Sequence, residues 1–193
     1  MSFVKNLIKS RAPDQTVFTF SDLNHSIDTY SGAKLKSALK YAVQKNDLIR
    51  VSRGVYSLSS NYSKQEFGNK YRSPSYVSLY TILVEAGIVF QPYLSLYLVA
   101  NRSEEVEVDG QKYVYRKIKN GILLNTFGIS HAGHVSKATI ERALCDKLYL
   151  DGDEHFDNLR PIDWKVMLKL NEQVYQNAVI SSFITKHAPH ENT

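Results

Sequence analysis

Apolar side chains recur at helical spacing close to the start of the chain: Phe3, Val4, Leu7 and Ile8. This spacing predicts a short amphipathic helix from Ser2 to Ser10, and Pro13 ends it. A brief extended run follows at 17–20. Ser21 stands where an N-cap residue is expected, so a second short helix is predicted to begin there.

A third helix is predicted from about Ala33 to Lys45, after a turn over residues 28–32. At about 100° per residue, its apolar side chains share one side: Leu35, Ala38, Leu39, Ala42 and, at the edge, Val43. Polar side chains share the other: Lys34, Lys36, Ser37, Lys40, Tyr41 and Gln44. Two short helices around a tight turn that contains glycine are typical of a helix-turn-helix.

A strand-turn-strand pattern follows at once, from Leu48 to Leu58. Gly54 can supply the positive φ angle that a tight hairpin needs, and Arg50 and Arg53 lie on the same hairpin. A helix-turn-helix followed by a basic hairpin indicates a winged helix. In such a module the third helix enters a major groove of DNA, and the hairpin arginines contact phosphates or the minor groove.

Charge supports this interpretation. The first 60 residues carry nine basic and four acidic side chains, whereas the remaining 133 carry 15 of each sign. No acidic residue lies between Ser31 and Asn46, although ordinary solvent-facing helices mix both signs. A local excess of this kind indicates a polyanion-binding module. The residues expected to contact double-stranded DNA are Ser31, Lys34, Lys36, Ser37, Lys40, Tyr41, Arg50 and Arg53.

The second half of the chain predicts a different domain. Residues 61–72 are polar and aperiodic, which indicates a linker. Ser73-Pro74 predicts the start of a helix that Gly87 ends. Strands are expected from Tyr93 onward, with hairpin signals at Asp109-Gly110 and Asn120-Gly121 that predict an antiparallel meander.

Helical spacing returns from about Lys137 to Leu150, and a last long helix is predicted to begin near Asp163. Residues 188–193 are expected to be a disordered tail. The predicted fold class is therefore α+β, with a winged helix at 1–60, a linker at 61–72, and a domain at 73–187 of helices packed on the meander.

Candidate chemistry is sparse. Three histidines and the single cysteine could suggest a metal site: His131, His134, Cys145 and His155. Their spacing lacks the paired ligands of a zinc motif, so no metal, cofactor or catalytic residue is expected. Asp163-Trp164-Lys165, with Asp151, Asp153 and Asp157 upstream, faintly resembles a nuclease metal site, but Asp163 is better explained as a helix N-cap.

Two further sets of polar residues have plain structural interpretations. Charged pairs near residue 145 are expected on a helix surface: Glu141, Arg142, Asp146 and Lys147. Tyrosines in the second half are expected to pack on the sheet, with a subset open for interaction: Tyr76, Tyr80, Tyr93, Tyr97, Tyr113 and Tyr115. The start of the chain lacks a signal-peptide pattern, no stretch is long and apolar enough for a membrane span, and a lone cysteine fits a reducing compartment, so a cytoplasmic protein is expected.

Three motifs, in order, resemble a known family. Leu48–Tyr56 resembles the hairpin of AbiEi-type antitoxins, which ends in an Arg-Gly-Val-Tyr-like turn. Ser73–Leu79 resembles their Pro-Ser-Tyr-Ile-Ser helix start. Ala138–Asp146 resembles their Ala-Thr-Pro-Glu-Lys-Ala-Leu-Leu-Asp segment, with Ile140 in place of the proline. The resemblance covers about residues 20–151.

The resemblance implies a bacterial antitoxin that also regulates its own operon. Its winged helix would bind operator DNA, and its C-terminal domain would counter a nucleotidyltransferase-type toxin, an activity tied to phage defence. Two other functions remain open. One is a free-standing winged-helix regulator whose second domain senses a ligand or oligomerises; the other is a metal-dependent nuclease.

Overall fold

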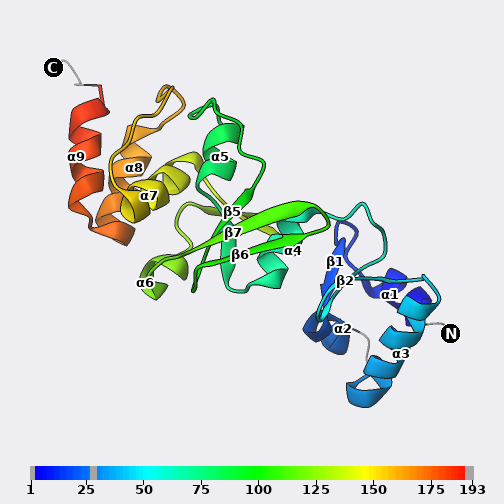
Figure 1. Cartoon of the computed structure of the whole chain (residues 1–193). Coiled ribbons are helices and arrows are strands. Elements are labelled where there is room, and N and C mark those ends of the chain that lie inside the picture. Colours follow the sequence, from blue (N-terminus) through cyan, green and yellow to red (C-terminus); the bar gives the residue numbers. More distant parts are fainter. Residues whose placement is uncertain (1–2, 27–29, 190–193) are drawn as a thin grey trace. The chain divides into compact units, whose positions relative to one another are not determined.

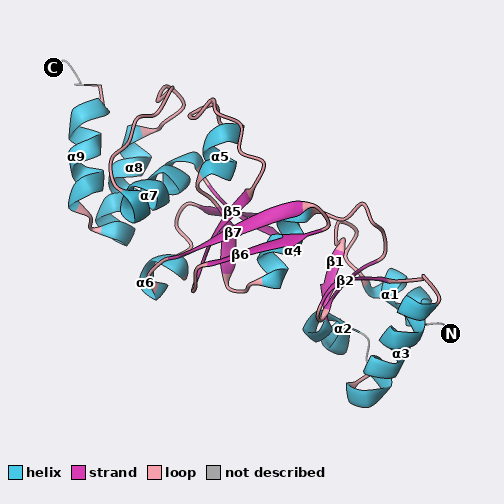
Figure 2. Cartoon of the chain, viewed as in Figure 1, coloured by secondary structure: helices cyan, strands magenta, loops and turns pink. Residues whose placement is uncertain are grey.

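The computed structural model describes residues 3–26 and 30–189 (Figure 1). The chain divides into two compact units, Met1–Tyr71 and Arg72–Thr193. Each unit combines helices with a β-sheet, which confirms the mixed α+β class (Figure 2). Three parts of the predicted scheme lie outside the described residues: Ser2 at the start of the first helix, positions 28–29 of the turn before the third helix, and positions 190–193 of the predicted disordered tail.

The N-terminal unit contains, in chain order, α1 (Phe3–Ser10), β1 (Val17–Thr19), α2 (Phe20–Ser26), α3 (Gly32–Gln44), β2 (Ile49–Ser52), β3 (Val55–Ser57) and α4 (Lys64–Tyr71). The three strands form an antiparallel sheet with β3 between β1 and β2. The three predicted helices and the hairpin are thus present. Gly54 occupies the hairpin turn with φ +78°, as the tight turn requires.

The predicted phase of α3 is correct. Leu35, Leu39 and Ala42 are buried and pack with apolar residues of α1, α2 and the sheet. The polar side of α3 faces solvent. Helical periodicity is therefore sufficient to place the inward and outward faces of this element.

The cap of α2 differs from the prediction. Thr19, not Ser21, precedes the first turn: its Oγ1 accepts from the backbone N–H of Asp22 at 3.0 Å, and its own N–H donates to the Asp22 carboxylate at 2.9 Å. This reciprocal pair is a capping box. Ser21 lies inside the helix.

The predicted linker is wrong in its local structure, because residues 64–71 form α4. Glu66 is 1% exposed and accepts hydrogen bonds from the Thr16 backbone N–H and hydroxyl at 2.9 and 2.5 Å. Lys70 donates to the Val17 carbonyl at 2.7 Å and pairs with Asp22 at 2.9 Å. Two of the polar residues that suggested a solvated linker, Glu66 and Lys70, therefore form hydrogen bonds that hold α4 against β1 and the residue before it.

The C-terminal unit contains β4 (Ser75–Val77), α5 (Tyr80–Glu85), β5 (Leu96–Ala100), β6 (Glu104–Val108), β7 (Gln111–Lys117), α6 (Asn120–Leu123), β8 (Ile129–Ala132), β9 (Val135–Ala138), α7 (Ile140–Asp151), α8 (Trp164–Leu170), the π-helical turn η1 (Asn171–Tyr175) and α9 (Ala178–His187). The strands form one sheet in the order β6-β7-β5-β4-β9-β8. Helices α7, α8 and α9 pack together at one end of this unit (Figure 1).

The sheet is mixed and not the predicted antiparallel meander. The β6–β7 hairpin at Asp109-Gly110 is present, but β5 pairs in parallel with β7, and β4 in parallel with β9. Tyr113 and Tyr115 of β7 are 0% and 1% exposed, which suits a central strand. The three glutamates of β6 suit an edge, where charge discourages further pairing.

The helix predicted from Ser73 to Gly87 is a strand followed by a short helix. Tyr76 and Ser78, two residues apart, both direct their hydroxyls to Asp146. This period of two requires extended backbone, so β4 occupies residues 75–77 and α5 begins only at Tyr80.

Two other elements differ from the prediction. Asn120-Gly121 opens α6 instead of a hairpin, because Ile122 and Leu123 are both buried and adjacent residues of a strand would face opposite sides. The last long helix is broken at Gln176, whose φ is +48°. The buried Asn171 amide bonds the backbone of Asn177 there, and Asn177 caps α9.

Candidate nucleic-acid interface

Helix α3 and the β2–β3 hairpin carry seven of the eight residues predicted to contact DNA, and the eighth, Ser31, is the N-cap of α3. Every one of these side chains belongs to an exposed residue: Ser31, Lys34, Lys36, Ser37, Lys40, Tyr41, Arg50 and Arg53. Tyr41 is 61% exposed although it is large and aromatic. The structure therefore places these residues in solvent on two neighbouring elements.

A groove of about 430 Å³ lies between α3 and the hairpin. Its basic lining residues are Lys36 and Lys40 from α3 and Arg50 from β2. Its apolar lining residues are Phe20, Leu39, Val43 and Tyr56. The groove thus brings together three of the five predicted basic contacts.

The other predicted contacts lie apart from this groove. Lys34, Ser37 and Tyr41 line a second hollow, of about 420 Å³, on the α1 side of α3. The Lys34 ammonium lies 5.1 Å from the centre of the Tyr30 ring, within the range of a cation–π contact. Arg53 stands in the hairpin turn beside Gly54 and lines neither hollow.

The basic residues of this face keep their charge available. Within residues 3–26 and 30–189, no ion pair involves Lys34, Lys36, Lys40, Arg50 or Arg53. The N-terminal unit as a whole has 11 basic and five acidic residues. A surface with several unpaired positive charges attracts polyanions, and their counterions are released on binding.

Two acidic side chains of the N-terminal unit, Asp22 and Glu66, form ion pairs with Lys70, whereas Asp47 lines the second hollow together with Lys34. Burial tends to raise the pKa of Asp22, but hydrogen bonds from Lys70 and Thr19 outweigh it and lower that pKa. This carboxylate therefore joins α2 to α4.

The C-terminal unit holds a buried ionic network that the sequence did not predict. Arg142 and Asp146 were expected on a helix surface, yet both are 0% exposed. The Arg142 guanidinium donates to the carbonyls of Phe127 and Ile122, each at 2.7 Å. Its Nε lies 3.8 Å from the Asp146 carboxylate. The expectation was wrong because α7 is enclosed on more than one side.

Three hydroxyls complete the shell of Asp146. Tyr76 donates to it at 3.0 Å, Ser78 at 2.7 Å and Tyr175 at 2.6 Å. Burial raises the pKa of Asp146, although Arg142 and these donors oppose the shift. The hydroxyls come from β4, from the residue that follows it and from η1, so the network holds α7 to these segments, although the buried Arg142 Nε itself makes no hydrogen bond to a described residue. The only sequence signal was Ala143-Leu144-Cys145, an apolar run between the two charges.

Lys147, also expected at the surface, is 3% exposed. Its ammonium contacts Glu154 at 2.7 Å and Asp151 at 3.0 Å, and lies 4.8 Å from the centre of the Tyr80 ring. Burial raises the pKa of the Tyr80 hydroxyl to about 12. Lys147 is thus held between two carboxylates and an aromatic face, and Glu141 alone of the four remains half-exposed on its helix.

The residues weighed as metal ligands are dispersed. His131 and His134 lie on the β8–β9 hairpin, whereas Cys145 is buried in α7. Among the described residues, no group of three or more histidine, cysteine or carboxylate side chains could hold a metal ion. Asp163 accepts from the N–H groups of Lys165 and Val166, which confirms that it is a helix N-cap, here of α8.

The six tyrosines divide between core and surface. Tyr76, Tyr113 and Tyr115 are buried. Tyr80, Tyr93 and Tyr97 form a partly exposed cluster in which the Tyr80 and Tyr93 rings stack with centroids 4.2 Å apart. Half of the six tyrosines are therefore buried in the unit and half remain partly accessible, in line with the expectation of packing with an open subset.

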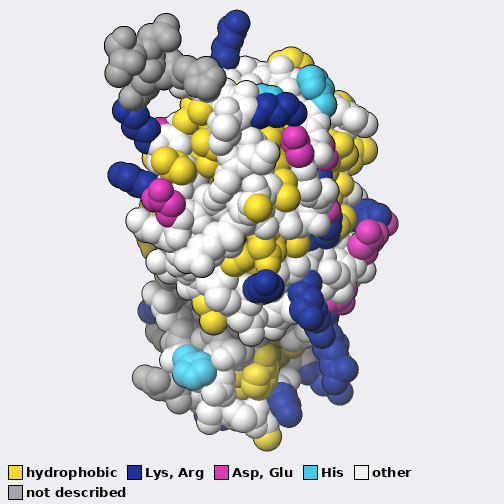
Figure 3. All heavy atoms as spheres, turned by 90° about the vertical axis from the view of Figure 1, so that its left-hand side faces the viewer, with side chains coloured by type: hydrophobic (Ala, Val, Ile, Leu, Met, Phe, Trp, Pro, Cys, Tyr) yellow, Lys and Arg dark blue, Asp and Glu magenta, His cyan; other side chains and the backbone are white. Residues whose placement is uncertain are grey.

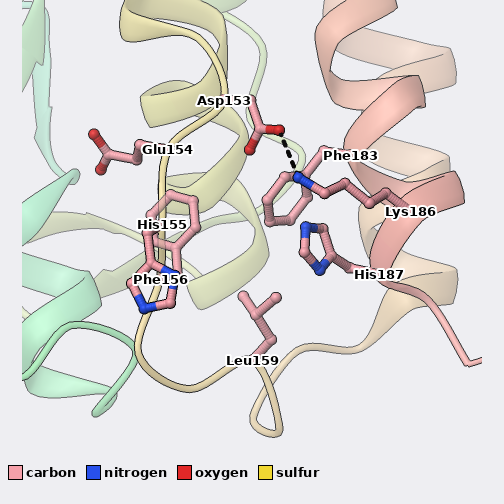
Figure 4. A pocket seen from close by; sticks show the side chains of 8 residues that line it. All are labelled: Asp153, Glu154, His155, Phe156, Leu159, Phe183, Lys186 and His187. Atoms are coloured by element: carbon pink, nitrogen blue, oxygen red, sulfur yellow. Dashed lines mark hydrogen bonds and ion pairs between the residues drawn. The ribbon is translucent and has the colours of Figure 1, made fainter.

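A pocket of about 510 Å³ opens beside α9 (Figure 4). Its lining residues are Asp153, Glu154, His155, Phe156, Leu159, Phe183, Lys186 and His187. Asp153 and Lys186 neutralise each other at 3.2 Å. Basic and acidic side chains are also interspersed over the surrounding face of this unit (Figure 3). The pocket lacks the single-sign character of the groove beside α3.

No family model matches the chain, and no curated protein matches its sequence. In the part of the chain that the structure describes, no helix has the length and apolar character needed to cross a bilayer.

Proposed function

We propose that the N-terminal unit is a winged helix that binds double-stranded DNA, and that the protein is an antitoxin that represses its own operon. In this proposal α3 enters the major groove and the β2–β3 hairpin contacts the backbone or the minor groove. The observation that carries it is the exposed face of α3 and the hairpin. Five basic residues lie there without an acidic partner among the described residues: Lys34, Lys36, Lys40, Arg50 and Arg53.

The order of elements in the N-terminal unit supports the same proposal. Three helices precede the β2–β3 hairpin. The second strand of this hairpin, β3, also pairs with β1. The inward side of α3 is apolar and the outward side is basic and polar. A helix held by its apolar side, with its basic side free, is suited to dock against phosphates.

DNA binding is tested with the full chain and the DNA upstream of its own gene. A gel-shift titration is expected to give a complex that dissociates as salt increases, and a reporter fused to that DNA is expected to be repressed. If the chain leaves both the mobility and the reporter unchanged, the DNA-binding proposal is wrong.

The antitoxin role rests on the three ordered motifs that resemble AbiEi-type antitoxins. In this proposal the partner is a nucleotidyltransferase-type toxin, and the C-terminal unit provides protection. Co-expression with the product of the adjacent gene tests it: growth arrest by that product alone, relieved by the full chain, is the expected result. Arrest that persists with the chain present would contradict the antitoxin role.

The pocket beside α9 favours a second candidate, a free-standing regulator whose C-terminal unit senses a ligand. At about 510 Å³ the pocket lies within the size range of small-molecule sites. An adjacent gene product without toxicity would favour this candidate over the antitoxin.

A further inference from the structure

The groove between α3 and the hairpin combines two kinds of surface. Phe20, Leu39, Val43 and Tyr56 line it with apolar atoms. Lys36, Lys40 and Arg50 line it with positive charge, and none of the described residues that line it is acidic. A free anion would need only the charges, whereas an occupant with alternating apolar and anionic groups would use both.

One strand of DNA has this alternation. Each nucleotide presents an apolar deoxyribose edge between two phosphates. Lys36 and Lys40 are one helical turn apart on α3, with Cβ atoms about 5–6 Å from each other. Arg50 belongs to β2, on the opposite side of the groove. The three cations therefore stand on both sides of an apolar groove of about 430 Å³.

We infer that this groove holds the sugar–phosphate backbone of a single strand of the duplex. Lys36 and Lys40 contact neighbouring phosphates of that strand from α3, Arg50 contacts the same strand from the hairpin, and the deoxyribose rings lie on the apolar lining. This inference rests on the proposed DNA binding and specifies which part of the DNA the groove contacts. Arg53 and Lys34, which do not line the groove, contact the duplex independently of it.

The charge of the groove is tested with a matched pair of double variants of the full chain. Lys36→Gln with Lys40→Gln removes two charges from the groove, whereas Lys5→Gln with Lys9→Gln removes two exposed charges from α1. Binding to a fluorescent random-sequence duplex is followed by anisotropy between about 50 and 200 mM salt. Circular dichroism melts verify that each variant is folded.

The groove variant is expected to reduce the slope of log K against log salt by about 2, since each lost phosphate contact removes about 0.9. The α1 variant is expected to retain the wild-type slope. Equal slopes for the two variants would overturn the inference while leaving DNA binding intact. Failure of the wild type to bind any duplex would instead overturn the proposed function.

The single-strand claim is tested by neutral phosphates. Duplexes with one methylphosphonate at successive positions of either strand are titrated with the wild type and with Lys40→Gln. The wild type is expected to bind more weakly when the neutral phosphate lies at any of a few adjacent positions of one strand. For Lys40→Gln, the neutral phosphate at one of these positions is expected to have no additional effect, because the lysine that contacts it is absent. The inference would be contradicted if methylphosphonates in both strands weakened binding and each caused the same loss of affinity for Lys40→Gln as for the wild type.

Discussion

The Tyr175 hydroxyl donates a 2.6 Å hydrogen bond to the Asp146 carboxylate, and both side chains are buried. This bond joins η1 to α7 in the centre of the C-terminal unit. Asp146 also lies beside the buried Arg142 guanidinium. The third motif of the chain, from Ala138 to Asp146, thus contributes to the core rather than to an exposed surface.

Removal of the buried carboxylate is expected to cost more than loss of a surface ion pair. Asp146→Ala leaves Arg142 buried without a counter-charge, so it should lower the free energy of unfolding by about 3–5 kcal/mol. Tyr175→Phe removes one donor of three and should cost about 1 kcal/mol. Chemical denaturation of each variant measures both.

Asp153→Ala is the matched control, because Asp153 and Lys186 are exposed partners. Its expected cost is at most about 1 kcal/mol. If Asp146→Ala and Asp153→Ala cost the same, the buried network does not stabilise the unit.

Leu39 and Tyr41 lie two residues apart on α3 but at 2% and 61% exposure. Leu39→Ala should destabilise the chain by about 2–5 kcal/mol because it creates a cavity in the core. Tyr41→Ala should leave the melting temperature nearly unchanged and weaken DNA binding. Thermal melts and gel shifts on both variants would contradict this assignment if they gave the reverse order.

The lowered pKa of Asp22 predicts a pH dependence of stability. Because folding lowers this pKa below its ordinary value of 3.8, the stabilisation is fully present above that value. It is lost as the pH falls through the lower pKa of the folded state. The difference in unfolding free energy between the wild type and Asp22→Asn should therefore be constant near neutral pH and shrink below 3.8.

Denaturant titrations across the acid range measure this difference. Asp14→Asn, a change at an exposed residue between α1 and β1, is the control for the general effect of removing one carboxylate from this unit. A difference for Asp22→Asn that stays constant down to strong acid would show that its pairing with Lys70 does not depend on the carboxylate charge.

The two roles proposed for the chain are separable by mutation. The change of Lys34, Lys40 and Arg53 together to Ala should abolish repression of the operon. The same full-length variant should still relieve toxicity of the adjacent gene product, since these residues belong to the N-terminal unit. Both genes are expressed from foreign promoters in this test. If the variant then fails to protect cells from the adjacent gene product, protection depends on DNA binding.

The N-terminal unit was more predictable from sequence than the C-terminal unit for a physical reason. The apolar spacing of α3, with Leu35 and Leu39 inward, is a local signal that its packing satisfies. Gly54 likewise marks its turn by a backbone requirement. Where one side of an element is buried and the other is solvated, the periodicity of apolar residues predicts both the type of element and its buried side.

The C-terminal unit depends on contacts between residues far apart in sequence. Arg142 and Asp146 are polar by type, and their burial follows from groups contributed by Tyr76 and Tyr175. The position of β7 between β5 and β6 is likewise a tertiary outcome. Glu66 shows the same effect in the N-terminal unit, since its partner Thr16 lies 50 residues away.

A salt titration of the full chain on the DNA upstream of its gene tests the central claim most directly. With about four to six phosphates neutralised, log K should fall against log salt with a slope of roughly −4 to −5. The triple change of Lys34, Lys40 and Arg53 to Ala should weaken binding at least about tenfold and flatten the slope by about 3. A slope near zero for the wild type, or an unchanged affinity for the folded triple variant, would contradict an electrostatic DNA interface on α3 and the hairpin.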